Sequence, residues 1–299
     1  MRVFFFGGKG GVGKTTASSA FAVKLSEQGK KVLLLSTDPA HSLSDVFNTE
    51  LQGETKLSEN LTVKEIDLNE ELKEYRSRVF KLAEATLRKE TLRELEGIIH
   101  SLEESPGIED VVIFEALSKE VVYRENEYDY IVVDTAPTGH TLGLLKTVRN
   151  LGNFLEEIVK LKEKVYELKK LSGKSVHEEA LEYLKERKER FKKFSEIIYD
   201  KSYFFAVLTP EKLPFEETKR LVNSLKHYGI RVKALIINKV LPENPQDEFL
   251  KARKEVEKKF LKEIENYFMD IEKISIPYQK EEVVGYEKLK EFSKFLPLG

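Results

Sequence analysis

Short runs of apolar residues alternate with longer segments of helical periodicity along most of the chain. Seven of these runs have the length of strands, and most of them are continuously apolar rather than alternating, at residues 3–6, 31–36, 61–68, 130–137, 203–210, 232–239 and 272–277. Continuous apolar runs are typical of parallel strands that are buried on both faces. Their alternation with helices predicts an α/β fold with a mostly parallel, doubly wound sheet.

Two segments, residues 69–126 and 151–200, interrupt this alternation, because their apolar residues recur every three or four positions. We therefore predict one domain, residues 1–299, with an inserted helical subdomain. The apolar stripes have two interpretations: they pack against one another, which is their commoner use, or some of them line an exposed groove for a partner helix. The mixed-sign run KERKERFKK, residues 185–193, predicts a solvated helix face rather than a nucleic-acid patch.

The composition narrows the function classes. The chain has 50 Lys and Arg against 52 Asp and Glu, and it has no cysteine. The balanced charge argues against a nucleic-acid partner, and the lack of cysteine excludes disulfides, thiolate nucleophiles and cysteine-ligated zinc. No apolar run is long enough to span a membrane, and the N-terminal run RVFFFGG shows no signal peptide. We expect a cytoplasmic protein without stable membrane insertion.

The segment GKGGVGKT, residues 8–15, matches the phosphate-loop pattern G-x-x-x-x-G-K-[ST] between an apolar strand and a helix. Glycines let backbone N–H groups converge on phosphate oxygens, and the helix N-terminus adds partial positive charge. We expect ATP and Mg²⁺, with Lys14 on the β- and γ-phosphates, Thr15 on the metal and Thr16 on the α-phosphate. The predicted nucleotide-binding residues of the loop are Gly8, Lys9, Gly10, Gly11, Val12, Gly13, Lys14, Thr15 and Thr16.

Two later segments lie where a γ-phosphate could be sensed, because each follows a predicted strand. They are STDPAHSLSDVF, residues 36–47, and DTAPTGHTLGLL, residues 134–145. Asp38 is the candidate that orients or deprotonates the attacking water, and Asp134 the candidate that holds Mg²⁺ through water. The alternative is that Asp38, which precedes a proline, and Asp45 only cap turns and helices, which is the commoner role of such an aspartate taken alone. The neighbouring phosphate loop favours the catalytic interpretation.

The motifs GGKGGVGKTT, STDPAHSLSD and DTAPTGHTL together resemble the family of arsenite-pump ATPases and guided-entry ATPases for tail-anchored membrane proteins, of the deviant phosphate-loop class. SPGIEDVVIFEAL, IINKV and IP extend the similarity over most of the chain. The resemblance implies a homodimeric, Mg-ATP-hydrolysing ATPase. In it, Lys9 reaches the nucleotide of the other subunit, Asp38 is the catalytic residue of the first switch, and Asp134 opens the second. Asn238 and Pro277 are implied to contact adenine.

The lack of cysteine departs from the family pattern and makes the chain similar to a cysteine-free archaeal or bacterial member. Many targeting ATPases of the family bind zinc through a Cys-x-x-Cys pair, and pump ATPases sense the metalloid through cysteines, so no zinc is expected here. Three functions stay open. The protein binds and targets tail-anchored or other hydrophobic membrane-protein helices, drives an anion or arsenite efflux pump as its soluble subunit, or acts as a partition-type dimer switch.

Overall fold

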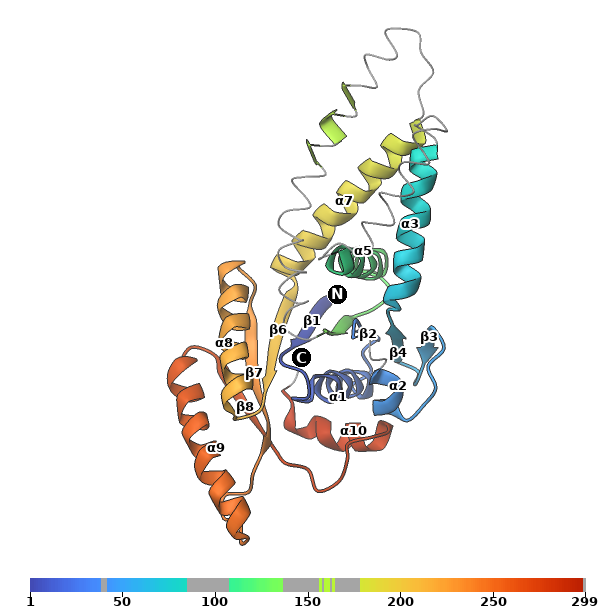
Figure 1. Ribbon diagram of the computed structural model, residues 1–299. Helices are drawn as coiled ribbons and strands as arrows, with labels where there is room; N and C mark the ends of the chain where they lie inside the picture. The colour runs from blue at the N-terminus through green and yellow to red at the C-terminus, as the bar shows by residue number, and fades with distance from the viewer. Residues whose placement is uncertain are drawn as a thin grey trace, which may run out of the picture. The chain divides into compact units, whose positions relative to one another are not determined.

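The fold is taken from a computed structural model that describes residues 1–38, 42–84, 108–136, 156–157, 159–161, 163–164 and 178–297 (Figure 1). Parts of the predicted switch segments, residues 39–41 and 137–145, lie outside the described residues. So do residues 85–107 and 165–177 of the predicted helical segments.

The strands are β1 (Arg2–Gly7), β2 (Val32–Ser36), β3 (Glu54–Lys56), β4 (Leu61–Glu65), β5 (Tyr130–Asp134), β6 (Ser202–Leu208), β7 (Val232–Val240) and β8 (Glu272–Pro277). In the described part of the chain they form one sheet of order β3-β4-β2-β5-β1-β6-β7-β8. All pairings are parallel except that of β3 with β4. The predicted doubly wound α/β fold is confirmed. The sequence analysis missed β3, because this strand is short, polar and exposed.

The helices with printed bounds are α1 (Lys14–Glu27), α2 (Ser42–Phe47), α3 (Leu68–Glu84), α5 (Ile108–Tyr123), α7 (Glu178–Asp200), α8 (Lys212–His227), α9 (Glu248–Tyr267), α10 (Tyr286–Phe292) and the 3₁₀ turn η1 (Ser293–Phe295). The chain divides into two compact units. The first comprises residues 1–66, 125–142 and 198–299 and contains the sheet. The second comprises residues 67–124 and 143–197. A single domain with an inserted helical subdomain stays a prediction.

In the first unit, aromatic side chains form the centre of the core. Phe4 and Phe6 of β1 contact Phe21 of α1 with ring centroids 5.0 and 5.5 Å apart, and Phe205 of β6 lies 5.3 Å from Phe21. The right-handed crossovers β1–α1–β2 and β6–α8–β7 run in opposite directions along the sheet, so α1 and α8 cover opposite faces. Figure 1 shows α8 and α9 on one side of β6 to β8, and α1 and α10 on the other. This arrangement leaves the carboxyl ends of the strands open for a ligand.

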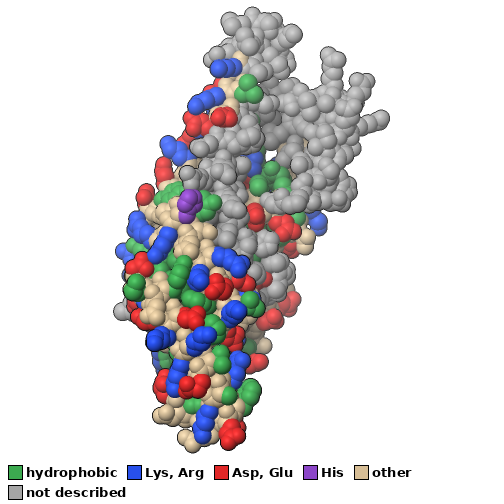
Figure 2. Space-filling view, turned by 60° about the vertical axis from the view of Figure 1, so that its left-hand side comes forward, with side chains coloured by type: hydrophobic (Ala, Val, Ile, Leu, Met, Phe, Trp, Pro, Cys, Tyr) green, Lys and Arg blue, Asp and Glu red, His purple; other side chains and the backbone are tan. Residues whose placement is uncertain are grey.

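The face that carries α8 and α9 has both signs of charge interspersed, with small apolar patches between them (Figure 2). Exposed ion pairs such as Lys226 with Asp270, at 2.7 Å, and Arg253 with Glu211, at 2.8 Å, contribute to this pattern. Exposed pairs of this kind add little stability, so they mainly determine the surface charge. Among the described residues, no helix has both the length and the apolar character that a membrane crossing requires.

In the second unit, a buried ionic cluster joins α5 to α7. Glu115 of α5, only 2% exposed, binds Arg187 at 2.6 Å and Arg190 at 2.9 Å. Arg190 also donates to the Ser118 hydroxyl at 3.2 Å. Phe114 packs edge-on against Phe191 of α7, with ring centroids 4.6 Å apart. The prediction of a solvated face for residues 185–193 is therefore wrong at Arg187 and Arg190, because their guanidinium groups neutralise a buried carboxylate.

We predict that Glu115→Gln destabilises the protein by about 3 kcal/mol, because removal of one partner leaves buried charges uncompensated. The free energy of unfolding from denaturant titration measures the effect. Glu255→Gln is the matched control, since Glu255 pairs with Lys258 at 2.8 Å on an exposed face and its removal should change little. Equal effects of the two substitutions would contradict a structural role for the cluster.

Candidate functional site

The glycine loop between β1 and α1 is a close-packed turn. A Cβ atom added to Gly8 would lie 2.1 Å from the carbonyl oxygen of Val207 on β6, so only glycine fits against this backbone. Gly13 precedes α1 and has a left-handed backbone with φ of 94°, which also favours glycine. The loop is thus held against the sheet at its start and turned into the helix at its end.

The N-terminus of α1 has no side-chain cap. Gly13 is the N-cap residue, and it makes no capping hydrogen bond. The first turn of α1 contains no acidic residue that would compensate the helix dipole. The first N–H groups of a helix have no partner within the helix, so here they are available to an anion. This geometry is suited to binding a phosphate group.

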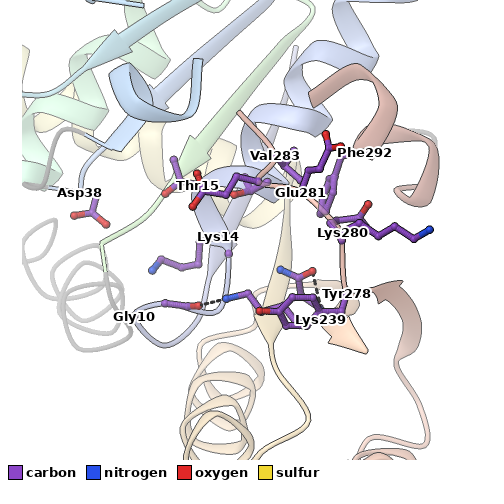
Figure 3. A pocket seen from close by; sticks show the side chains of 16 residues that line it. Gly10, Lys14, Thr15, Asp38, Lys239, Tyr278, Lys280, Glu281, Val283 and Phe292 are labelled. Atoms are coloured by element: carbon purple, nitrogen blue, oxygen red, sulfur yellow. Dashed lines mark hydrogen bonds between the residues drawn. The ribbon is translucent and has the colours of Figure 1, made fainter. Parts of the chain in front are cut away.

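A pocket of about 650 Å³ opens beside this helix N-terminus (Figure 3). In Figure 3, Lys14 and Thr15 extend from the start of α1, Asp38 lies at one end, and Tyr278 and Lys280 lie at the other. The lining residues are Gly10, Gly11, Gly13, Lys14, Thr15, Thr16, Asp38, Asn238, Lys239, Tyr278, Gln279, Lys280, Glu281, Glu282, Val283 and Phe292. They come from the carboxyl ends of several strands, where open α/β sheets bind ligands.

A buried carboxylate lies beside the start of α1. Asp134, at the end of β5, is fully buried, and its Oδ2 accepts a hydrogen bond of 2.7 Å from the Thr15 hydroxyl. Its Oδ1 is also buried and has no hydrogen-bond partner within the described residues. The Asp134 carbonyl accepts from the Thr37 N–H at 3.0 Å, which joins the ends of β5 and β2. A buried oxygen without a donor is one that a cation or its bound water could satisfy.

Burial raises the pKa of Asp134 to about 7, and the nearby Asp38 carboxylate acts in the same direction. The hydrogen bond from Thr15 and the positive charge of Lys14 lower this pKa, but they do not cancel the effect of burial. The ionised form of this carboxyl group is therefore only partly stabilised by the fold, and a cation placed beside it would favour that form.

The structure brings most of the predicted site residues together. Gly10, Gly11, Gly13, Lys14, Thr15, Thr16, Asp38 and Asn238 line the pocket, while Gly8 and Val12 belong to the loop that forms it. The backbone N–H of Asp38 donates to the Ser36 hydroxyl at 3.1 Å, which fixes the exit of β2. Lys9 is half-buried and Pro277 is exposed, and both lie outside the described lining. The catalytic and binding roles of all these residues stay predictions.

Several lining residues were missed in the sequence analysis. They are Lys239 directly after Asn238, the segment Tyr278–Val283 after β8, and Phe292 of α10. Lys239 and Tyr278 stand at the carboxyl ends of predicted strands, and this position could have identified them. Nothing in the local sequence around Phe292 distinguishes it from an ordinary residue of a packed last helix.

The fold and the pocket define a phosphate-loop nucleotide hydrolase. The anion-transporting ATPase family matches residues 1–298. The chain is 33% identical to a putative arsenical pump-driving ATPase 1 of Aquifex aeolicus, over 99% of this chain and 78% of the relative. It is 34% identical to an ATPase ASNA1 homolog of Entamoeba histolytica, over 97% and 92%. It is 31% identical to the ATPase get3 of Pyrenophora tritici-repentis, over 99% and 91%.

The chain therefore belongs to the anion-transporting ATPase family, and it is an ATPase. The resemblance inferred from the three motifs is confirmed. The relatives include proteins named for arsenical pumps and proteins named ASNA1 and get3, so membership in the family is compatible with more than one physiological function.

We predict that Asp134→Asn stabilises the protein in EDTA without nucleotide, and only above pH 4. Because the pKa of Asp134 is raised to about 7, the folded protein keeps a proton that the unfolded chain loses near pH 4. Stability therefore falls as the pH rises through this window. At pH 8 the variant should be more stable by on the order of 2–4 kcal/mol, since one pKa unit corresponds to about 1.4 kcal/mol.

Chemical denaturation of both proteins at pH 4 and pH 8 measures this difference. Asp200→Asn, at the exposed end of α7, is the control and should show the same small effect at both pH values. A difference for Asp134→Asn that did not depend on pH would rule out titration of this carboxylate.

Proposed function

We propose that this protein is a homodimeric ATPase that hydrolyses Mg-ATP and uses the closing and opening of its two subunits to act on a hydrophobic membrane-protein helix. The observation that supports the ATP site is the uncapped N-terminus of α1 beside the hydrogen bond from the Thr15 hydroxyl to the buried Asp134. The loop N–H groups and Lys14 bind the phosphates, and Thr16 binds the α-phosphate. A cytoplasmic location is part of this proposal.

The residues around Asp134 fit a magnesium ion. The Thr15 hydroxyl donates its proton to Asp134 Oδ2, and a hydroxyl oxygen that donates in this way can also serve as a metal ligand. Asp134 Oδ1, buried and without a donor among the described residues, suits a water molecule on that metal. Oxygen ligands of this kind are those that Mg²⁺ prefers. The bound ion would neutralise charge that develops on the phosphate oxygens.

The role proposed for Asp38 follows from its position in the pocket. It lies at the end of β2, on the same side of the pocket as Lys14 in Figure 3, and away from the Tyr278 end. A carboxylate placed beside the γ-phosphate can orient the attacking water and accept its proton. We propose that adenine binds toward the opposite end, near Asn238 and Pro277.

Lys9 is proposed to act on the other subunit. Lys14 already lines the pocket of its own chain, whereas Lys9 lies outside the described lining and is half-buried in the loop. We therefore propose that Lys9 contacts the nucleotide bound to the other subunit rather than the nucleotide of its own chain. A cation supplied in trans stabilises the transition state of phosphoryl transfer.

The proposal that subunit closing and opening acts on a hydrophobic helix is based on the family motifs and on the second unit. That unit contains amphipathic helices, and Leu161, which lies in the predicted helical segment 151–200, is 64% exposed. An exposed apolar side chain of this kind suits contact with an apolar helix. The second candidate is the soluble subunit of an anion or arsenite pump, favoured by the relatives named arsenical pump-driving ATPases. Arsenite itself prefers thiolates, and this chain has none.

We predict that Lys9→Ala lowers the rate of ATP hydrolysis by about 10³-fold, because it removes a cation that acts in the transition state. An equal mixture of Lys9→Ala and Asp38→Ala subunits tests the trans role. In a mixed dimer, the subunit with Asp38 intact receives Lys9 from its partner, so about one quarter of the wild-type rate should return. If Lys9 acts within its own chain, the mixture stays inactive. The mixture also stays inactive if the subunits do not exchange, so labelled subunits are used to measure the formation of mixed dimers.

We further predict that the protein co-purifies with a co-expressed tail-anchored helix, because an apolar segment is stabilised when it is removed from water. The control is the same tail with charged residues placed in its apolar segment. Addition of arsenite to the ATPase assay should leave the rate unchanged. No binding of the apolar tail by folded dimer, together with stimulation by arsenite, would favour the pump subunit instead.

A further inference from the structure

Two consecutive residues at the end of β7 hold the phosphate loop by its carbonyl groups. The side-chain Nδ2 of Asn238 donates to the Val12 carbonyl at 2.9 Å, in a buried contact. The Nζ of Lys239 donates to the Gly11 carbonyl at 3.1 Å. The two carbonyls are also consecutive, and more than two hundred residues of chain separate the loop from these donors. We define this four-residue contact as the β7 clamp.

The orientation of the Asn238 amide is determined by both of its neighbours. Its Oδ1 accepts from the Lys239 N–H at 2.9 Å, while its Nδ2 faces the Val12 carbonyl. A rotation of the amide by half a turn would place oxygen against oxygen and nitrogen against nitrogen. The donor of this side chain is therefore directed at the loop.

The backbone around the clamp is adapted to this contact. Lys239 has a left-handed conformation with φ of 59°, which is uncommon for a residue other than glycine. A Cβ atom on Gly13 would lie 2.4 Å from Asn238 Nδ2, so the amide can approach the loop only because residue 13 is glycine. The end of β7 and the phosphate loop therefore both have a restricted backbone conformation where they contact each other.

The clamp has a direct consequence for the direction of the loop N–H groups. In a planar trans peptide the N–H points opposite to the C=O, and the described chain contains no cis peptide bond. Because the Val12 carbonyl points toward β7, the Gly13 N–H of the same peptide unit points away from β7. The Gly11 carbonyl orients the Val12 N–H in the same way. Carbonyl oxygens repel phosphate, whereas N–H groups attract it.

We infer that Asn238 is a positioning residue for the phosphate loop, which holds the Val12 carbonyl away from the phosphates and so presents the neighbouring N–H groups to them. This role differs from the adenine contact that the family resemblance implies for Asn238, because a positioning role acts on every triphosphate regardless of its base. The inference rests on the proposed nucleotide site.

The test compares ligands that share phosphates and differ in the base. Binding of Mg²⁺ with ATP, with GTP and with inorganic tripolyphosphate is measured by calorimetry on the wild type and on Asn238→Leu, which keeps the volume and removes the amide. All three affinities should fall by the same factor, about tenfold, because one buried hydrogen bond to the loop is lost. The KM for ATP should rise while the preference for ATP over GTP stays constant.

Two further variants keep the test informative. Asn238→Ser, which removes the amide but keeps a polar side chain, replaces Asn238→Leu if that variant does not fold. Asn223→Leu is the matched control, because the Asn223 amide donates to Tyr267 at 2.9 Å on the exposed side of α8, and it should leave all three affinities unchanged.

The outcomes separate this inference from the proposed function. Loss of ATP binding with unchanged tripolyphosphate binding would overturn the positioning role and leave Asn238 as a base-reading residue, while the nucleotide site stands. A wild-type protein that bound none of the three ligands would overturn the nucleotide site and the inference together.

Discussion

The start of α1 imposes the main constraint on this structure. A buried helix begins at a glycine that cannot cap it, so its first N–H groups need an external partner. The neighbouring glycines bring the loop close to β6, and Gly8 leaves no room for a side chain there. The sheet order places the ends of β2, β5 and β7 around the same helix N-terminus. The strand ends that line the pocket therefore surround the N-terminus of α1.

The strand ends contribute different chemistry to the pocket. Asp134 from β5 brings a carboxyl group to the Thr15 hydroxyl, and Asp38, which follows β2, lies on the same side of the pocket as Lys14. The end of β7 supplies donors to the back of the loop instead of charge to the phosphates. Because each strand end is fixed by sheet hydrogen bonds, the relative positions of these groups are set before any ligand binds.

Part of this arrangement was predictable from the sequence, because apolar runs and the glycine pattern are local signals. Seven strands and the loop–helix junction were found in this way. The role of Asn238 Nδ2 was not predictable, since its partner Val12 lies 226 positions away and only the fold brings them together. The burial of Arg187 and Arg190 was missed for a related reason. The charged run itself contains no signal for Glu115, a distant carboxylate that pairs with two residues of the run inside the core.

The two buried carboxylates described here illustrate how structural and functional burial differ. Glu115 is matched by two guanidinium groups, so its charge is compensated within the fold. Asp134 accepts from the Thr15 hydroxyl, its Oδ1 has no donor among the described residues, and its pKa is raised to about 7. A protein that needed only stability would have paired this group or replaced it with an apolar residue. An incompletely paired carboxylate beside a phosphate loop is instead understandable as half of a site that a bound cation completes.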